Sequence, residues 1–176
     1  MRSLALLPLI LAPLLLSIPA WAQQRPAAPR PAANAPKSIG TFDDWQAATH
    51  QESGQLVCYA FTRASASTPA LPGRGDVVLT VTHRASGRDA VAISAGYAYP
   101  AGAEVEVQVD PAELQFYTAA RSAFARDGKA AVAAFQRGRS AVARSPAPRG
   151  PAVSDTFSLR GFSAAYTAIN KACPVR

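Results

Sequence analysis

Histidine and cysteine are scarce in this sequence, which has two of each among 176 residues. Two cysteines are too few for a disulfide-dense miniprotein or a four-cysteine zinc site. The two histidines, His50 and His83, form no His-Glu-x-x-His motif or similar spacing typical of a zinc hydrolase. A Gly-x-Ser-x-Gly elbow and a Gly-Lys-Ser phosphate loop are also missing. We therefore predict no catalytic residue, no metal site and no cofactor, and we expect both histidines at the surface.

Acidic residues are few: 11 Asp and Glu stand against 18 Lys and Arg, for a formal net charge of +7. The excess is greatest between residues 121 and 149, where Asp127 is the one acidic residue. Such a stretch favours anionic partners, such as acidic lipid or polysaccharide, although an ordinary solvated face of a basic protein has the same composition. The candidate anion-binding residues are Arg121, Arg126, Lys129, Arg137, Arg139, Arg144 and Arg149.

A long apolar run near the N-terminus, Leu4 to Ile18, carries no charge. Arg2 before it and Ala20-Trp21-Ala22 after it complete the pattern of a secretory signal peptide over residues 1–22, cleaved after Ala22. A retained membrane anchor is the alternative, but a spanning helix needs about 20 apolar residues and this run is shorter. We expect a periplasmic or secreted protein that does not span the membrane, for which nucleic acid is a poor partner.

Two segments follow the predicted cleavage site. Residues 23–37 are rich in proline and alanine and contain no residue that could begin a core, so they are predicted to be an extended linker. Residues 38–176 form the predicted folded domain, since this length suits a single domain.

Alternating polar and apolar residues predict β-strands through most of this domain. In Glu104 to Asp110 the three valines share one face and the polar residues the other, as in a half-buried antiparallel strand. Asp76 to His83 alternates similarly, and Leu56 to Arg63 is apolar on both faces, as in a central strand. Turn residues recur every 8–12 residues or so, which indicates an antiparallel sandwich or barrel. Further strands are predicted at 45–50, 90–99, 114–118, 122–126, 140–144 and 152–158, with a long loop at 64–75.

Two helices complete the predicted fold. Residues 129–136 are alanine-rich and form a short helix, while Phe162, Ala165 and Ile169 belong to an apolar stripe over residues 162–173. The fold class is therefore mainly β: an antiparallel β-sandwich or barrel-like domain with a short helix and a C-terminal helix.

Cys58 and Cys173 lie at opposite ends of this domain. In an oxidising compartment two cysteines without others predict a disulfide, here joining the last helix to a central strand. The bond would close a loop almost as long as the whole domain, and in the chain-entropy model such a closure stabilises the folded protein by about 4–5 kcal/mol. Two buried free thiols are the alternative, and a redox-active Cys-x-x-Cys pair is absent.

Aromatic residues suggest a further candidate patch. Tyr97, Tyr99, Phe116 and Tyr117 would form one patch if their strands were neighbours. Such a patch could bind a partner, but the favoured interpretation is that these side chains complete the core, because aromatics dominate core burial.

The sequence resembles the invasion-associated locus B (IalB) proteins, exported bacterial proteins of similar size. The resemblance rests on Phe42-Asp43-Asp44-Trp45, on Cys58 in an apolar strand, and on Phe157 to Ala165 leading into a helix with Ile169 and Cys173. It covers residues 39–174. It implies a β-rich fold with a C-terminal helix, a periplasmic or envelope location and, in the named member, a contribution to entry into host cells.

Together these features predict a non-enzymatic envelope or periplasmic binding module that uses the basic stretch toward an anionic partner. The partner would be an envelope component or a host protein. Two alternatives stay open: a surface-exposed factor for host-cell invasion, and a small periplasmic hydrolase.

Overall fold

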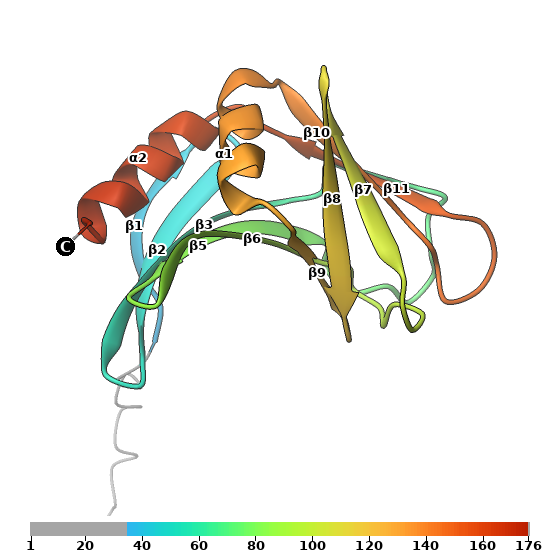
Figure 1. Ribbon diagram of the computed structural model, residues 1–176, viewed down its shortest axis with the longest axis horizontal. Coiled ribbons are helices and arrows are strands. Elements are labelled where there is room, and N and C mark those ends of the chain that lie inside the picture. The colour runs from blue at the N-terminus through green and yellow to red at the C-terminus, as the bar shows by residue number, and fades with distance from the viewer. Residues whose placement is uncertain (1–34, 176) are drawn as a thin grey trace, which may run out of the picture. The chain divides into compact units, whose positions relative to one another are not determined.

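Eleven antiparallel strands form one curled sheet in the computed structural model, which describes residues 35–175 (Figure 1). The order across the sheet is β1-β2-β3-β5-β6-β9-β8-β7-β10-β11-β4. The predicted signal peptide and nearly all of the predicted linker lie outside the described residues. The strands are β1 (Lys37–Phe42), β2 (Trp45–Glu52), β3 (Gln55–Arg63), β4 (Ala66–Thr68), β5 (Val78–Arg84), β6 (Gly87–Ser94), β7 (Glu104–Val109), β8 (Ala112–Ala119), β9 (Ser122–Ala125), β10 (Ser140–Ser145) and β11 (Val153–Ser158).

Between β3 and β4 the chain passes from the first half of the curled sheet to its opposite margin. β3 ends at Arg63, and β4 begins at Ala66 and pairs with β11. In between, the Ala64 N–H donates to the Val77 carbonyl at 2.9 Å and the Ser65 N–H to the Thr156 carbonyl at 2.8 Å. The ladder does not close on itself, since β1 and β4 are its two margins. This arrangement confirms the predicted mainly antiparallel, barrel-like fold.

Two helices pack on the inner face of the sheet. α1 (Gly128–Arg137) follows β9, and α2 (Phe162–Ala172) follows β11; both lie on the same side of β3, β5 and β6 (Figure 1). The Asp127 side chain caps α1 by accepting the Ala130 N–H at 2.9 Å, which satisfies a free donor of the first turn. Gly161 precedes α2 at φ 89°, and a Cβ there would meet the Phe42 carbonyl, so only glycine brings β11 into α2 at this point.

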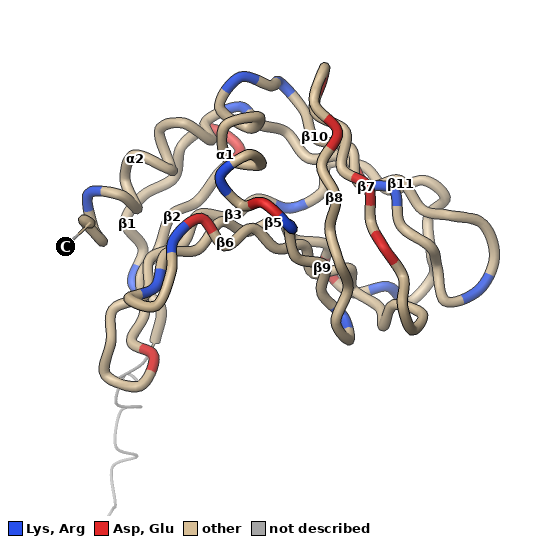
Figure 2. The backbone as a smooth tube through the Cα atoms, in the orientation of Figure 1, with Lys and Arg blue, Asp and Glu red and all other residues tan. Residues whose placement is uncertain are grey.

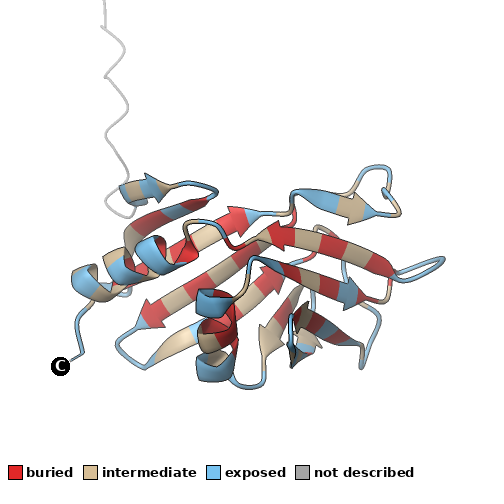
Figure 3. Ribbon diagram, turned by 90° about the horizontal axis from the view of Figure 1, so that it is seen from above, coloured by how far each residue is buried: buried red, intermediate tan, exposed pale blue. Residues whose placement is uncertain are grey.

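The core lies between the inner face of the sheet and these helices. Buried and exposed residues alternate along the strands (Figure 3), most clearly in β7, whose valines are buried between exposed glutamates. Trp45 is fully buried, contacts Phe162 edge-on at 4.8 Å between ring centroids, and donates its indole N–H to the Ser158 carbonyl at 2.9 Å. That bond ties the start of β2 to the end of β11, which are far apart in the sequence.

Three elements differ from the sequence prediction. β1 was not predicted, because it is an exposed margin strand without apolar alternation. β4 falls within the predicted 64–75 loop and owes its conformation to pairing with β11. The strand predicted at 90–99 ends at Ser94, since Gly96 has φ +74° and lies against the Gly75 carbonyl, where no side chain would fit.

Candidate functional site

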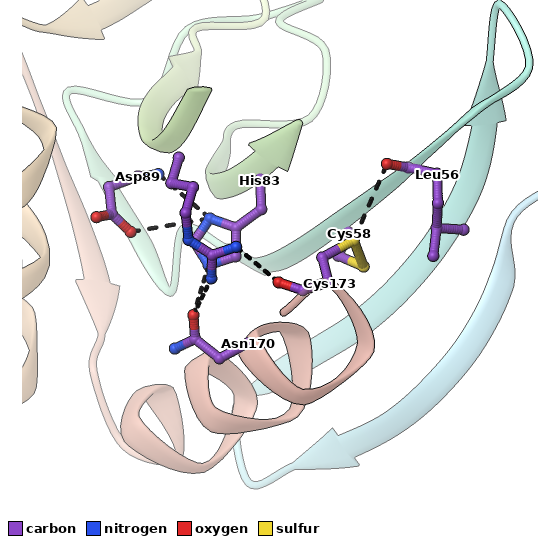
Figure 4. The surroundings of a disulfide bond; sticks show 7 residues. Leu56, Cys58, His83, Asp89, Asn170 and Cys173 are labelled. Atoms are coloured by element: carbon purple, nitrogen blue, oxygen red, sulfur yellow. Dashed lines mark hydrogen bonds and ion pairs between the residues drawn. A yellow bond between two sulfur atoms is a disulfide. The ribbon is translucent and has the colours of Figure 1, made fainter. Parts of the chain in front are cut away.

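A disulfide joins Cys58 on β3 to Cys173 at the end of α2, with 6.1 Å between the two Cα atoms (Figure 4). Cys58 is fully buried in the core. The predicted pairing is therefore confirmed, and the alternative of two free thiols is wrong.

His83 lies beside this disulfide and is fully buried on the inner face of β5 (Figure 4). Its Nδ1 accepts the backbone N–H of Asp89 at 3.2 Å, and its Nε2 lies 3.1 Å from the Asn170 Oδ1. Those two partners fit a neutral imidazole that carries its proton on Nε2. The expectation of a surface histidine is wrong here, because the inward position of His83 follows the alternation of β5.

Neighbouring side chains bind α2 to the β5–β6 hairpin at the same place. Arg88 donates to the Cys173 carbonyl at 2.6 Å and to the Asn170 Oδ1. The Tyr166 hydroxyl donates to the Asp89 Oδ1 at 2.7 Å. The hairpin therefore holds α2 at its C-terminal end independently of the disulfide.

Burial changes the pKa of two side chains in this cluster, His83 and Tyr166. Loss of water lowers the pKa of His83 and the Arg88 charge lowers it further, while Asp89 and Asn170 oppose the shift. Loss of water, together with the hydrogen bond to Asp89, raises the pKa of Tyr166. Since both His83 nitrogens are engaged within the protein, neither is free to take a proton from a substrate. The cluster is thus a structural connection.

A second buried polar cluster fastens the long loop that precedes β5. Arg74 forms two parallel 2.7 Å bonds with the Asp155 carboxylate, and the side chains are 6% and 2% exposed. Arg74 also donates to the Ala95 carbonyl at 2.6 Å, and Ser67 donates to Asp155 at 2.7 Å. Within residues 35–175, every fully buried side-chain nitrogen and oxygen has a hydrogen-bond partner. Neither interior cluster therefore leaves an unpaired group aimed at a ligand.

The predicted aromatic patch is divided between the interior and the surface. Phe116 is fully buried in the core, and Tyr97 is buried with its hydroxyl 2.9 Å from the Ser145 hydroxyl. Tyr99 is half-buried against Tyr97. Tyr117, by contrast, points outward, is 46% exposed, and stacks on Phe124 at 5.6 Å.

The seven predicted anion-binding residues are all exposed, but they lie on different parts of the fold (Figure 2). Arg137 and Arg139 precede β10, whereas Arg149 follows its other end, beyond a six-residue strand about 20 Å long. Arg126 is already paired with Glu104 at 2.5 Å. The other three are Arg121 in the β8–β9 turn, Lys129 on α1 and Arg144 on β10. The structure thus separates residues that are adjacent in the sequence.

A different surface gathers side chains that lie far apart in the sequence. Phe61, Thr80, Ala92 and Phe124 are direct cross-strand neighbours on β3, β5, β6 and β9. All four alternate with core residues and so point away from the helices. With Tyr59 next to Phe61 and Tyr117 next to Phe124, we call this set the outer aromatic face: Tyr59, Phe61, Thr80, Ala92, Phe124 and Tyr117.

The outer aromatic face contains a shallow hollow of about 330 Å³ at its β3 side. Tyr59 is held there between two rings, edge-on to His50 at 5.5 Å and stacked with Phe61 at 5.9 Å. At the rim, Arg84 donates to Glu52 at 2.7 Å, and this bond and charge lower the pKa of Glu52. We call this place the Tyr59 hollow; its lining residues are Pro36, His50, Tyr59, Thr80, Thr82 and Arg84.

One sequence signal pointed to this face. The segment Leu56 to Arg63 is apolar on both faces, which correctly predicted a central strand. Its core side includes Cys58, Ala60 and Thr62, so the aromatic side chains Tyr59 and Phe61 occupy the outward side. Aromatic residues on the outward side of a strand are thus the detectable trace of this surface.

The family model described as invasion associated locus B (IalB) protein matches residues 45–170. The chain belongs to the IalB family. Among solved structures, the invasion associated protein B from Bartonella henselae is similar, with a TM-score of 0.56 and 20% identity over 76% of this chain and 95% of that chain. At this identity the likeness concerns the fold. No curated protein matches the chain significantly.

The IalB match confirms the resemblance and covers β2 to most of α2, with every lining residue of the Tyr59 hollow except Pro36. The disulfide and the IalB family indicate an extracytoplasmic protein, because disulfides persist in oxidising compartments. Among residues 35–175, no helix is long and apolar enough to cross a membrane.

Proposed function

We propose that this IalB family protein is exported and acts as a non-catalytic binding protein of the cell envelope, which contacts its partner through the outer aromatic face. The carrying observation is the straight row Phe61, Thr80, Ala92 and Phe124, uncharged and on the side of the sheet opposite α1 and α2 (Figure 1). Aromatic side chains that remain partly exposed in a patch are typical of interaction surfaces.

Two observations support a binding role without catalysis. His83 is saturated by hydrogen bonds within the fold, and the Arg74–Asp155 pair is saturated too. Neither arrangement offers a free base that could activate water or a neighbouring nucleophile for hydrolysis. The disulfide and the signal-like residues 1–22 support export, so the partner is sought in the envelope.

The exposed basic residues support attraction of an anionic partner at a distance. Because Arg137 and Arg149 lie at opposite ends of β10, they supply a general positive potential and no single anion site. A host-cell partner is the second candidate, favoured by the invasion-associated name of the Bartonella protein. Labelling of intact cells with an antibody against the domain would favour this candidate.

Photocrosslinking in living cells tests the proposal. Phe61 is replaced by benzoylphenylalanine, and the matched control carries the same residue at Gln115, an exposed outward position of β8. We expect Phe61 to crosslink an envelope component and Gln115 to yield no such product, while mass spectrometry finds a mature N-terminus at Gln23. Equal crosslinking at both positions, or none at Phe61, would contradict the proposal.

A further inference from the structure

We infer that the Tyr59 hollow binds one sugar unit of a glycan. This inference rests on the proposed function and specifies its partner. It follows from three features of the hollow: a fixed aromatic ring, hydroxyl groups beside it, and an arginine at the rim with no carboxylate among the lining residues.

The aromatic ring is Tyr59. Its position is determined from both sides, by His50 edge-on with an interplanar angle of 69° and by Phe61 stacked at 29°. The face of an aromatic ring is negatively polarised, and the C–H groups on the flat side of a pyranose carry the complementary positive polarisation, so a sugar can pack on the part of the Tyr59 ring that lines the hollow. Binding then costs little side-chain entropy, because the ring is already ordered.

Hydrogen-bonding groups surround this ring. Thr80 and Thr82 lie on the adjacent strand β5, and Thr82 is the direct cross-strand neighbour of Tyr59. A threonine hydroxyl both donates and accepts, and the His50 imidazole has one donor and one acceptor when neutral. Sugar hydroxyls need this mixture, and a pocket with an apolar wall and a few polar groups is the general form of a small-ligand site.

Charge at the rim favours a neutral or acidic sugar over a cationic ligand. Arg84 is the charged side chain in the lining, and Glu52 outside it is occupied by Arg84. A carboxylate on the ligand would approach the remaining guanidinium donors of Arg84, which bind such groups in pairs. A cationic ligand would meet no free carboxylate in the hollow.

The face beyond the hollow allows a longer chain to bind. Phe61 and Phe124 stand at the two ends of one cross-strand row, three strand spacings or about 14 Å apart. The side chains between them, Thr80 and Ala92, are small and leave the surface open. Phe124 and Tyr117 form a second stacked pair, at 5.6 Å, for a more distant sugar unit.

The test measures binding of the mature protein to an array of neutral and acidic oligosaccharides that contain hexoses, N-acetylhexosamines and uronic acids. We expect at least one probe to bind. Tyr59→Ala should weaken binding of that probe at least tenfold, Tyr59→Phe should keep most of it, and Gln115→Ala on β8 should change nothing. Thr82→Val should weaken it about two- to tenfold, as for one lost hydrogen bond.

Two outcomes overturn the inference: no probe binds, or Tyr59→Ala and Thr82→Val, each folded by circular dichroism, bind as the wild type does. Failure of this inference is separable from failure of the proposed function. If benzoylphenylalanine at Phe61 captures an envelope protein while no glycan binds, the face is a protein-binding surface, the proposed function stands and the glycan inference is wrong.

Discussion

The outer surface of the sheet has two regions with contrasting side chains. Strands β7, β8 and β10 present a charged outer face, made of Glu104, Glu106, Gln108, Glu113, Gln115 and Arg144. Strands β3, β5, β6 and β9, together with Tyr117 near the end of β8, present the outer aromatic face. Both regions bury mostly small and branched apolar residues on their inner side, with Phe116 on β8 and His83 on β5 as larger exceptions, so the contrast lies mainly on the outer side.

This contrast shows which residues the fold needs and which it does not. Solvated glutamate and glutamine are what an outward strand position requires for solubility, and they suffice on β7 and β8. Half-buried tyrosine and phenylalanine on β3 and β9 leave apolar surface in water, which is unfavourable for a protein without a partner. The proposed function accounts for these aromatic residues, since a partner on the outer aromatic face would cover that apolar surface.

The largest effect should come from the interior that supports both regions. Asp155→Ala leaves the Arg74 guanidinium buried without its carboxylate and should lower the free energy of unfolding by about 3–5 kcal/mol. Urea unfolding followed by circular dichroism measures it. Asp76→Ala is the matched control, because it breaks the exposed Arg63–Asp76 pair and should cost at most about 1 kcal/mol. Similar losses in both variants would show that the buried Arg74–Asp155 pair contributes no more to stability than an exposed ion pair.

A smaller effect is expected from pH, acting through His83. Because burial lowers the pKa of His83 in the folded protein, the unfolded chain binds more protons at acidic pH. The contribution of His83 to stability is therefore complete above its ordinary pKa of 6.5 and decreases as pH falls below that value. Urea midpoints between pH 7.5 and 5.5 measure the change.

His83→Gln separates this effect from other titrating groups. This variant should show a weaker dependence on pH over the same range, because it removes the group whose pKa folding lowers. A wild-type midpoint that is the same at pH 7.5 and 5.5 would mean that His83 is not held neutral by the fold.

The smallest effect on stability is expected from exchanging residues between the two outer regions. Phe61→Gln and Gln115→Phe should each change the free energy of unfolding by about 1 kcal/mol or less, because both positions face outward on strands. The Phe61→Gln protein should nevertheless no longer be retained in the envelope fraction of the cells, whereas the Gln115→Phe protein should be retained there. A large stability loss in Phe61→Gln with unchanged retention would reverse the assignment of the outer aromatic face.

The parts of the fold that depend on local pattern were predictable. Alternating valines located β7, the apolar stripe from Phe162 to Ile169 located α2, and two lone cysteines predicted the disulfide. β1 and β4 were not predictable, because β1 is an exposed margin strand and β4 is held by pairing with β11. Local sequence carries no signal for a strand whose conformation comes from a distant partner.

The candidate site depended on the tertiary structure to a greater degree. The sequence predicted anion binding by residues 121–149, where basic residues lie close together in the chain. The structure places two of them, Arg137 and Arg149, at opposite ends of β10. His83 was expected at the surface, but the alternation of β5 turns it inward onto α2.

By itself, the sequence determined which side of the alternating strands, such as β5 and β7, is apolar, where the last helix lies and which sulfur atoms pair. Those properties follow from periodicity and from the number of cysteines. The tertiary structure alone decided that β9 lies next to β6, which brings Phe124 into the same row as Phe61. The physical reason is that neighbours across a sheet are set by the order of hydrogen-bonded strands, and this order depends on how the whole chain packs around one core.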